Sequence, residues 1–407
     1  MGPVSPPTAR GARTAPAPPA AEPPRRSLVV AVLAVVALVL LVPASGALVP
    51  QVPGWGHLGA AASSRAVWLA VGGLAVLLAG TAALLRRASA TRLGVVLAGA
   101  ATVVCALTVL TQQLLVAQEH GVAVRIGELF AVERPVRPPD RDAVYARFEG
   151  RPLDLSVWEP ASGGSGAPVV VLVHGGGWVT GDRRRPGTAA HAGWFADQGY
   201  VAVSVDYPLS DDDEHRWDVV EPQVACALVW VARHAAEHGG EPGRVFLVGD
   251  SAGGNVALDV AYRARAGTLE PACDGDVPEV AAVSTLYPVA DPAGLHDNPD
   301  PLVGDDARTM AERYTGGSPA EVPQRYDAVT PATHVTPSSP PTVTVTGAAD
   351  HLVPPQGAAD LAATLAAHDV DHQHVEIPAA GHVVDAAPGG VGTQVWRELT
   401  LRLFATS

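Results

Sequence analysis

Residues 244–255 read RVFLVGDSAGGN and decide the fold of this chain. Residues 245–248 are an apolar run of the length of a strand that is covered on both faces. Ser251 then stands between small residues, and residues 252–266 have the periodicity of a helix. A serine at a tight turn from a buried strand into a helix holds its hydroxyl clear of the backbone. The stretch therefore predicts both a covered sheet and a nucleophile.

Short β-branched runs alternate with helical patterns through the rest of this region. The alternation predicts a mostly parallel sheet with helices on both faces, whose ligands bind at the carboxyl ends of the strands. The strands are expected at residues 153–158, 169–174, 200–206, 244–249, 280–287, 342–347 and 374–377. The helices are expected at residues 188–198, 219–237, 252–266, 355–368 and 391–404.

The residues around the serine form a G-x-S-x-G pattern. Gly249 and Asp250 precede Ser251, and Gly253 follows one residue later. Larger side chains would clash in so tight a turn, which explains the small flanking residues. A glycine-rich helix N-terminus that binds phosphate is the alternative interpretation of this pattern alone.

A second glycine-rich stretch follows the strand expected at residues 169–174. It reads HGGGW and contains His174, Gly175, Gly176 and Gly177. Glycines let backbone N–H groups approach a substrate oxygen, and an oxyanion needs two or three such donors. We expect the donors to be the N–H groups of Gly176 and Gly177, together with that of Ala252. A flexible turn is the alternative.

A serine hydroxyl needs a histidine to accept its proton and an acid to orient that histidine. Asp350 lies just past the strand expected at residues 342–347, and His382 follows the strand expected at residues 374–377. We expect these two residues to serve Ser251. The competing acids are Asp291, Glu376 and Asp385.

No metal site or cofactor is predicted. His372 and His374 alternate on a strand, but the sequence offers no third ligand beside them. The residues around Ser251 need no organic cofactor for acyl transfer.

The motifs together resemble the hormone-sensitive-lipase-like branch of the α/β-hydrolases, which are esterases and lipases that act on carboxylic esters. The resemblance covers about residues 144–404 and is most specific at the serine turn and the HGGGW loop. It rests on the motifs at residues 174–178, 206–207, 249–255 and 287–288.

This resemblance implies a nucleophile at Ser251, a general base at His382 and an orienting acid at Asp350, in the chain order of that fold. Two departures limit it. The helices that usually precede the sheet are replaced by apolar segments. Residues 347–353 are closer to the acid loop of acetyl-xylan- and feruloyl-esterase-like or dienelactone-hydrolase-like relatives. The preferred acyl chain therefore stays open.

The N-terminal third is predicted to be a membrane region, residues 27–117. Hydrophobic residues make up 48% of the chain although aromatic residues make up only 5%, a profile typical of lipid-facing helices. Each of three apolar segments, residues 28–49, 66–85 and 93–117, has the ~20 residues that a spanning helix requires. Buried core helices are the alternative.

The remaining organisation follows from composition. Residues 1–26 are rich in Pro and Ala and are predicted to be a disordered tail. Residues 118–140 are expected to be a stalk or linker, and residues 141–407 the α/β-hydrolase domain. Residues 291–336 are predicted to form a short cap over the site, with a structureless surface excursion as the alternative.

The arginines predict the orientation of the spans. They cluster before the first segment and between the second and third, which places these parts on the cytoplasmic side and the hydrolase domain outside. If the first segment is instead a cleaved signal peptide, the domain still faces outward. The residues are Arg10, Arg13, Arg25, Arg26, Arg86, Arg87 and Arg92, against Arg65 alone in the first loop.

Charge and cysteine content exclude other classes. The net charge is −14, which is unlike a nucleic-acid binder. Three cysteines without a C-x-x-C pair do not form a zinc framework. Cys226 and Cys273 could pair outside a cytosol, but we favour two buried free thiols.

The sequence thus predicts a multi-pass, membrane-anchored serine hydrolase that cleaves a small-molecule or lipid-like carboxylic ester. Its partners are the substrate and the lipid bilayer, and not nucleic acid. An acyltransferase or peptidase with the same residues, or a silent binding protein on a hydrolase fold, is the alternative. A transporter is disfavoured because the spans lack charged residues.

Overall fold

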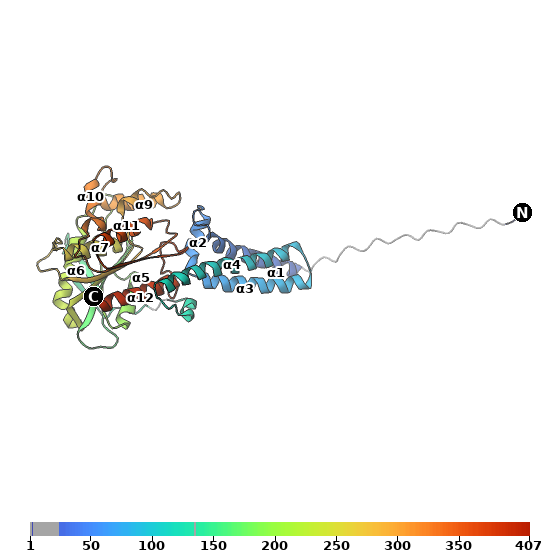
Figure 1. Ribbon diagram of the computed structural model, residues 1–407, viewed down its shortest axis with the longest axis horizontal. Helices are drawn as coiled ribbons and strands as arrows, with labels where there is room; N and C mark the ends of the chain where they lie inside the picture. Colours follow the sequence, from blue (N-terminus) through green and yellow to red (C-terminus); the bar gives the residue numbers. More distant parts are fainter. Residues whose placement is uncertain (1, 3–23, 134–135) are drawn as a thin grey trace.

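The computed structural model describes Gly2, residues 24–133 and residues 136–407. A bundle of long helices lies at one end of the molecule, and a rounded α/β domain lies at the other (Figure 1). The predicted disordered tail, residues 1–26, falls almost entirely outside the described residues. Its last residues begin the first helix, which starts at Pro24.

Three helices of the bundle are long and apolar enough to cross a membrane. They are α1 (Pro24–Gly46), α3 (Ala66–Arg86) and α4 (Ala90–Glu119). Large apolar side chains such as Leu78 and Val104 are exposed along them, as expected of surfaces that face lipid. A short helix that the sequence did not predict, α2 (Trp55–Ser63), lies between α1 and α3, where the bundle meets the α/β domain (Figure 1).

The α/β domain contains one eight-stranded sheet in the order β1-β2-β4-β3-β5-β6-β7-β8. All pairs from β4 to β8 are parallel, whereas β2 is antiparallel to both of its neighbours. The strands are β1 (Arg141–Phe148), β2 (Arg151–Trp158), β3 (Ala167–Val173), β4 (Val201–Val205), β5 (Gly240–Asp250), β6 (Val280–Leu286), β7 (Thr342–Gly347) and β8 (His372–Ile377). The predicted mostly parallel sheet is confirmed, with β1 as an additional edge strand.

Helices cover both faces of this sheet, and each face has its own apolar core. One core includes side chains of α6 (Val220–His234), α7 (Ala252–Arg265) and α11 (Gln356–Ala367). The other includes side chains of α5 (Pro186–Asp197) and α12 (Val391–Thr406). The central strands are therefore buried on both sides, which explains their continuous apolar runs.

Residues 291–336 are largely helical. They form α8 (Pro292–His296), α9 (Gly304–Thr315), α10 (Pro323–Ala328) and a 3₁₀ turn (Pro331–His334). Helix α9 contributes Met310 to the wall of the cavity that contains Ser251. The segment thus lies over the carboxyl ends of the strands as a cap, and we call it the cap segment.

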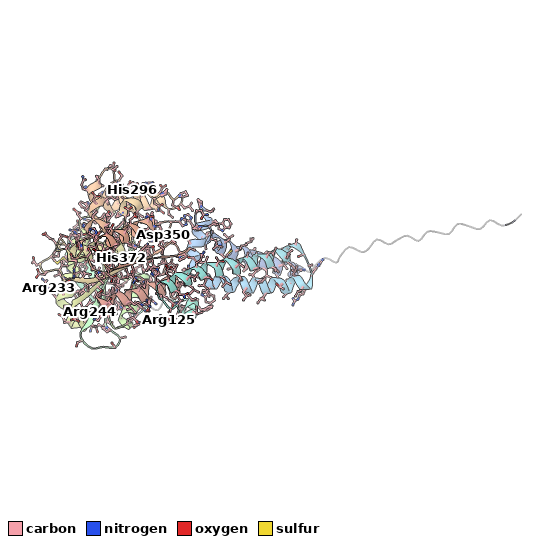
Figure 2. All side chains as sticks on the ribbon, in the orientation of Figure 1. Arg125, Arg233, Arg244, His296, Asp350 and His372 are labelled. Atoms are coloured by element: carbon pink, nitrogen blue, oxygen red, sulfur yellow. A yellow bond between two sulfur atoms is a disulfide. The ribbon has the colours of Figure 1, made fainter. Side chains whose placement is uncertain are left out.

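The segment expected as a stalk packs against the α/β domain. Leu129, in a 3₁₀ turn (Ile126–Phe130), is buried in the same core as α12. The N–H of Arg125 donates to Oε1 of Gln394 at 2.7 Å, at the junction of the bundle and the domain (Figure 2). Arg402 of α12 donates to the carbonyl of Gly121 at 2.8 Å. These contacts fix the bundle to the domain.

The prediction of two free thiols is wrong. Cys226 of α6 and Cys273, in the connection between α7 and β6, form a disulfide, with their Cα atoms 5.8 Å apart. This Cα–Cα distance suits a disulfide. The packing of α6 against the connection brings the two cysteines together. A sequence separation of 47 residues gave no indication of it.

Candidate active site

The turn after β5 holds Ser251 in a strained conformation. Its φ of 54° and ψ of −123° lie outside the usual regions for a residue with a side chain. The N–H of Ser251 donates to the carbonyl of Leu286 on β6 at 2.9 Å. A Cβ on Gly253 would lie 2.2 Å from the carbonyl oxygen of Val173, so only glycine fits there. The neighbouring strands therefore force the turn that exposes the serine hydroxyl.

Three predicted residues meet at this turn. Nε2 of His382 lies 3.0 Å from Oγ of Ser251, and Nδ1 of His382 lies 2.7 Å from Oδ2 of Asp350. The other carboxylate oxygen of Asp350 accepts the N–H groups of Leu352 and Val353, each at 2.9 Å. Both oxygens of this buried carboxylate are thus bound, which fixes the orientation of the imidazole.

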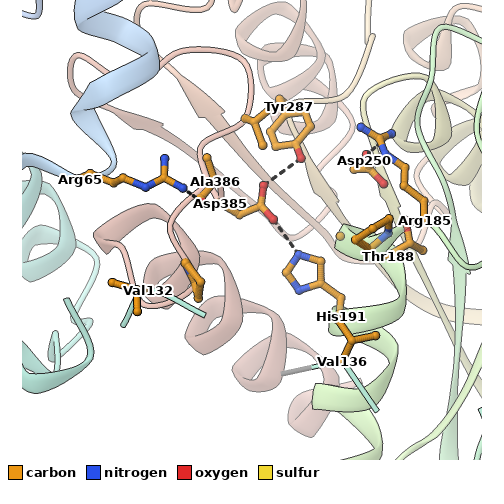
Figure 3. Close-up of a pocket in the computed structure, with 14 residues that line it drawn as sticks. Arg65, Val132, Val136, Arg185, Thr188, His191, Asp250, Tyr287, Asp385 and Ala386 are labelled. Carbon is orange, nitrogen blue, oxygen red and sulfur yellow. Dashed lines mark hydrogen bonds and ion pairs between the residues drawn. The ribbon is translucent and has the colours of Figure 1, made fainter. Parts of the chain in front are cut away.

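The competing acids lie elsewhere. Asp385 accepts from the hydroxyl of Tyr287 at 2.9 Å and bonds Nε2 of His191 at 2.8 Å (Figure 3). Asp291 caps the N-terminus of α8. Glu376 pairs with His374 at 3.4 Å. Of the four acids considered, Asp350 is the one bonded to His382.

His174 supports the glycine loop from beneath. It is 1% exposed, its Nδ1 lies 2.9 Å from the carbonyl oxygen of Gly175, and its ring stacks on Tyr207 at 4.4 Å between centroids. The hydroxyl of Tyr207 donates to the carbonyl of His174 at 2.8 Å. Burial lowers the pKa of His174, so its imidazole is neutral at pH 7 and serves as a structural support.

The glycine loop presents backbone donors beside Ser251. Among the described residues, no acceptor bonds the N–H groups of Gly176 and Gly177. Ala252 is the first residue of α7, where a helix leaves its N–H groups without partners. A Cβ would lie 2.0 Å from the carbonyl oxygen of Thr180 at Gly176, and 2.3 Å from Sδ of Met310 at Gly177. The backbone contact requires glycine at Gly176, and the positive φ of 62° favours glycine at Gly177.

Asp250 joins the serine turn to the glycine loop. Its Oδ1 accepts the N–H of Gly175 at 3.2 Å, and Arg185 lies 3.6 Å from its Oδ2. Burial raises the pKa of Asp250 from 3.8 to about 6, although Arg185 opposes the shift. The Asp250 side chain therefore connects the serine turn to the glycine loop.

A cavity of about 360 Å³ lies above these groups, under α9. We call it the catalytic cavity. It contains the serine, the imidazole and the glycines on one side and cap-segment residues on the other. Its lining includes Gly176, Gly177, Ser251, Met310, Leu352 and His382.

A second cavity of about 440 Å³ adjoins the first and shares Arg185, Asp250 and Tyr287 with it (Figure 3). The ring of Tyr287 lies 4.6 Å from that of His382. Sequence reasoning missed the contacts of Tyr287, Asp385 and His191, because no spacing indicates them. The one sequence signal for this region was the resemblance of residues 287–288 to the hydrolase family motif.

A mostly parallel sheet with a strained serine between β5 and α7 defines an α/β-hydrolase. The BD-FAE family model matches residues 155–365, which is more than half of the chain. The chain therefore belongs to the BD-FAE family.

Curated relatives are similar over part of the chain. A probable carboxylic ester hydrolase, LipM of Mycobacterium tuberculosis, is 30% identical over 254 residues, which cover 60% of this chain and 56% of that protein. The esterase LipQ of the same organism is 28% identical over 58% of this chain and 56% of that protein. The chain thus spans somewhat more than half the length of these relatives.

Solved structures share the fold. A thermophilic esterase of Thermogutta terrifontis, with propionate bound, has a TM-score of 0.54 at 23% identity, covering 67% of this chain and 96% of that one. A truncated carbohydrate esterase from gut microbiota has a TM-score of 0.55 at 18% identity, covering 66% and 98%. At such identity the likeness establishes the α/β-hydrolase fold.

Proposed function

We propose that this protein is a membrane-anchored serine hydrolase that cleaves carboxylic esters through an acyl-enzyme. The observation that carries the proposal is the continuous chain from Oγ of Ser251 through His382 to Asp350, with bonds of 3.0 Å and 2.7 Å. A hydroxyl within hydrogen-bond reach of an oriented imidazole is the arrangement of an activated nucleophile.

In the first half of the reaction, Ser251 attacks the ester carbonyl while Nε2 of His382 accepts its proton. The carbonyl oxygen becomes an oxyanion, which the N–H groups of Gly176, Gly177 and Ala252 stabilise. His382 then donates the proton to the leaving alcohol, and the acyl group stays on Ser251. Asp350 stabilises the imidazolium that exists between these steps.

In the second half, water attacks the acyl-enzyme with His382 as general base. The same backbone donors stabilise the second oxyanion, and the proton returns to Oγ of Ser251 as the acid leaves. Every proton transfer in the cycle passes through one imidazole nitrogen, which is why the orientation of His382 matters for both halves.

The relatives support ester hydrolysis as the reaction class. LipM is named a probable carboxylic ester hydrolase and LipQ an esterase, and the BD-FAE family model matches residues 155–365, which include Ser251. The cavity beside Ser251 is lined by both polar and apolar side chains, which suits an ester with an apolar portion.

Three observations support a membrane anchor with the α/β domain outside the cytoplasm. Three helices have the length and hydropathy of membrane spans, and the arginines favour the cytoplasmic side for the tail and the second loop. The Cys226–Cys273 disulfide suits an oxidising compartment.

The test compares Ser251→Ala with the unaltered full-length chain in detergent, using a short-chain chromogenic ester. We expect turnover to fall by at least about 10⁴-fold. Ser162→Ala, at an exposed loop position, is the matched control and should keep full turnover. Equal turnover of Ser251→Ala and the unaltered chain would refute the proposed nucleophile.

A further inference from the structure

A third cavity lies on the other side of His382, between the α/β domain and the inter-span helix α2. Its volume is about 360 Å³, within the range of small-ligand sites. We call it the junction cavity. Its walls include His57, Ala60 and Ala61 of α2 and Leu352, His382 and Val383 of the α/β domain.

The junction cavity and the catalytic cavity meet at the proposed general base. Leu352, His382 and Val383 line both cavities. An ester has two arms, one on each side of the carbonyl carbon. A substrate whose carbonyl lies beside Ser251 can therefore extend one arm under α9 and the other toward α2.

Hydrogen bonds hold α2 in place as a wall. The N–H of Gly381, next to the proposed base, donates to the carbonyl of Ala60 at 3.2 Å. Arg65, just after α2, donates to the carbonyl of Ala386 at 3.0 Å. Because a Cβ on Gly381 would lie 3.2 Å from that of Ala60, the two backbones are in close contact.

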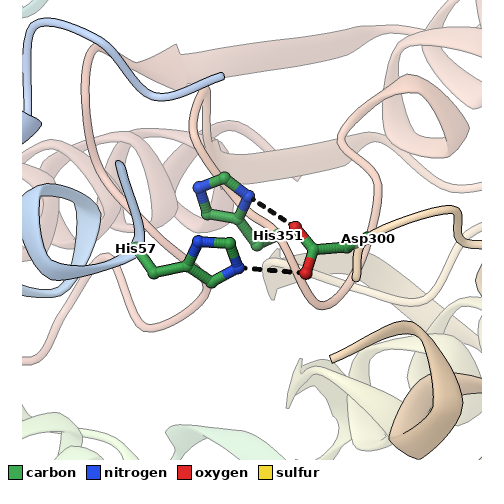
Figure 4. A group of neighbouring side chains, drawn as sticks. All are labelled: His57, Asp300 and His351. Atoms are coloured by element: carbon green, nitrogen blue, oxygen red, sulfur yellow. Dashed lines mark hydrogen bonds and ion pairs between the residues drawn. The ribbon is translucent and has the colours of Figure 1, made fainter. Parts of the chain in front are cut away.

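A bridge of three side chains links α2 to the cap segment and to the loop after β7 (Figure 4). The two oxygens of Asp300, in the cap segment, bond Nε2 of His57 and Nδ1 of His351, each at 3.0 Å. The two imidazole rings stack at 3.8 Å between centroids. Stacked rings direct their nitrogens in parallel, so that each meets a separate carboxylate oxygen. His351 directly follows Asp350, so the bridge reaches the acid loop itself.

Helix α2 also lies at the level where the spans end. Nε1 of Trp55 donates to the carbonyl of Val42 in the last turns of α1 at 2.7 Å. Trp55 and Leu58 are 44% and 55% exposed, and tryptophan is typical of the membrane interface. One face of α2 therefore suits lipid, and another lines the junction cavity.

We infer that α2 forms part of the substrate site, and that the junction cavity receives a hydrocarbon arm of a membrane-lipid ester. The inference rests on the proposed ester hydrolysis at Ser251. The continuity of the cavity with His382, its wall from the membrane-anchoring region and the exposed apolar face of α2 all favour this occupant. A water-soluble ester with short arms leaves the junction cavity empty.

The test uses a substitution on α2 that makes the junction cavity smaller. Ala61 is exposed and lines the cavity, so Ala61→Trp fills space without disturbing the core. The full-length chain in phosphatidylcholine vesicles is assayed on dilauroylglycerol and on 4-nitrophenyl acetate. We expect the ratio of the two kcat/KM values to fall about tenfold in Ala61→Trp.

Leu58→Trp is the matched control, because it places the same side chain on the same helix outside the junction cavity. Its ratio of kcat/KM on dilauroylglycerol to kcat/KM on 4-nitrophenyl acetate should stay within about twofold of the ratio for the unaltered chain. An unchanged ratio in Ala61→Trp, or an equal loss on both substrates, would overturn the inference. Failure of the proposed function is separate, since it shows as acetate turnover that survives Ser251→Ala.

Discussion

At the scale of single residues, Asp350 is bonded through both oxygens and faces the imidazole of His382. Asp350→Asn keeps the shape of the side chain but removes the charge that favours the productive tautomer and stabilises the imidazolium. We expect kcat for a short-chain ester to fall by about 10³–10⁴-fold. Steady-state kinetics on the purified full-length chain measure this loss.

Asp385→Asn provides the comparison, because Asp385 bonds Tyr287 and His191 rather than His382. Its loss in kcat should stay below about tenfold, since no proton of the reaction reaches it. If Asp385→Asn lost as much activity as Asp350→Asn, the assignment of the orienting acid would be wrong.

The pKa of Asp250 gives a prediction for stability. Because burial raises this pKa to about 6, the folded protein holds the proton more tightly than the unfolded chain does. The resulting stability is fully present below about pH 4 and is lost as the pH rises through about 6. Asp250→Asn does not titrate, so its Tm relative to the unaltered chain should rise by about 2–4 °C between pH 4 and pH 7. Thermal melts at both pH values measure the change.

Activity measurements test the structural role of Asp250 separately from its titration. Asn retains an oxygen that can accept the N–H of Gly175, whereas Asp250→Ala leaves the glycine loop without that bond. We expect kcat to fall at least about tenfold further in Asp250→Ala than in Asp250→Asn. A Tm difference between Asp250→Asn and the unaltered chain that is the same at pH 4 and pH 7 would contradict the raised pKa of Asp250.

The sequence predicted Ser251, Asp350 and His382 because each lies shortly after a strand, and parallel strands bring their carboxyl ends together. Their mutual geometry was an expectation, and the distances in the structure agree with it. The positions of Met310 and His191 could not be predicted, because Met310 lies in the cap segment and His191 lies on α5, and neither belongs to a motif.

At the scale of elements, the disulfide joins α6 to the connection after α7. Cys273→Ser opens a covalent loop with a sequence separation of 47 residues and should lower the free energy of unfolding by about 2–4 kcal/mol. Urea unfolding of the full-length chain in detergent, followed by fluorescence, measures the loss. A stability unaffected both by this substitution and by reductant would contradict a bonded pair.

Strand β1 and helix α2 are among the elements that escaped prediction, and they did so for different physical reasons. Strand β1 lies at the sheet edge with much of its surface exposed, so its residues lack the apolar run of a covered strand. Helix α2 contains Gly56 and Gly59, which disfavour a helix by propensity. A Cβ on Gly59 would lie 2.0 Å from the backbone nitrogen of Ala47. Close tertiary packing, which sequence alone does not report, requires these glycines and stabilises the helix.

At the scale of the whole molecule, the membrane orientation can be tested together with the nucleophile. An impermeant fluorophosphonate probe should label intact cells that express the full-length chain, and Ser251→Ala should abolish the labelling. The expectation follows from the proposed topology, in which the three candidate spans place the arginine-rich tail and second loop on the cytoplasmic side. Labelling that appears only after the cells are lysed would place the α/β domain on the cytoplasmic side.

The bond from the N–H of Gly381 to the carbonyl of Ala60 joins the loop that contains His382 to helix α2 of the proposed membrane anchor. Proteolytic shedding of the globular part would strip this loop of its support and expose a backbone donor to solvent. We therefore expect cleavage of the α/β domain from the N-terminal helices to inactivate the enzyme, so that activity and attachment to the cell are lost together.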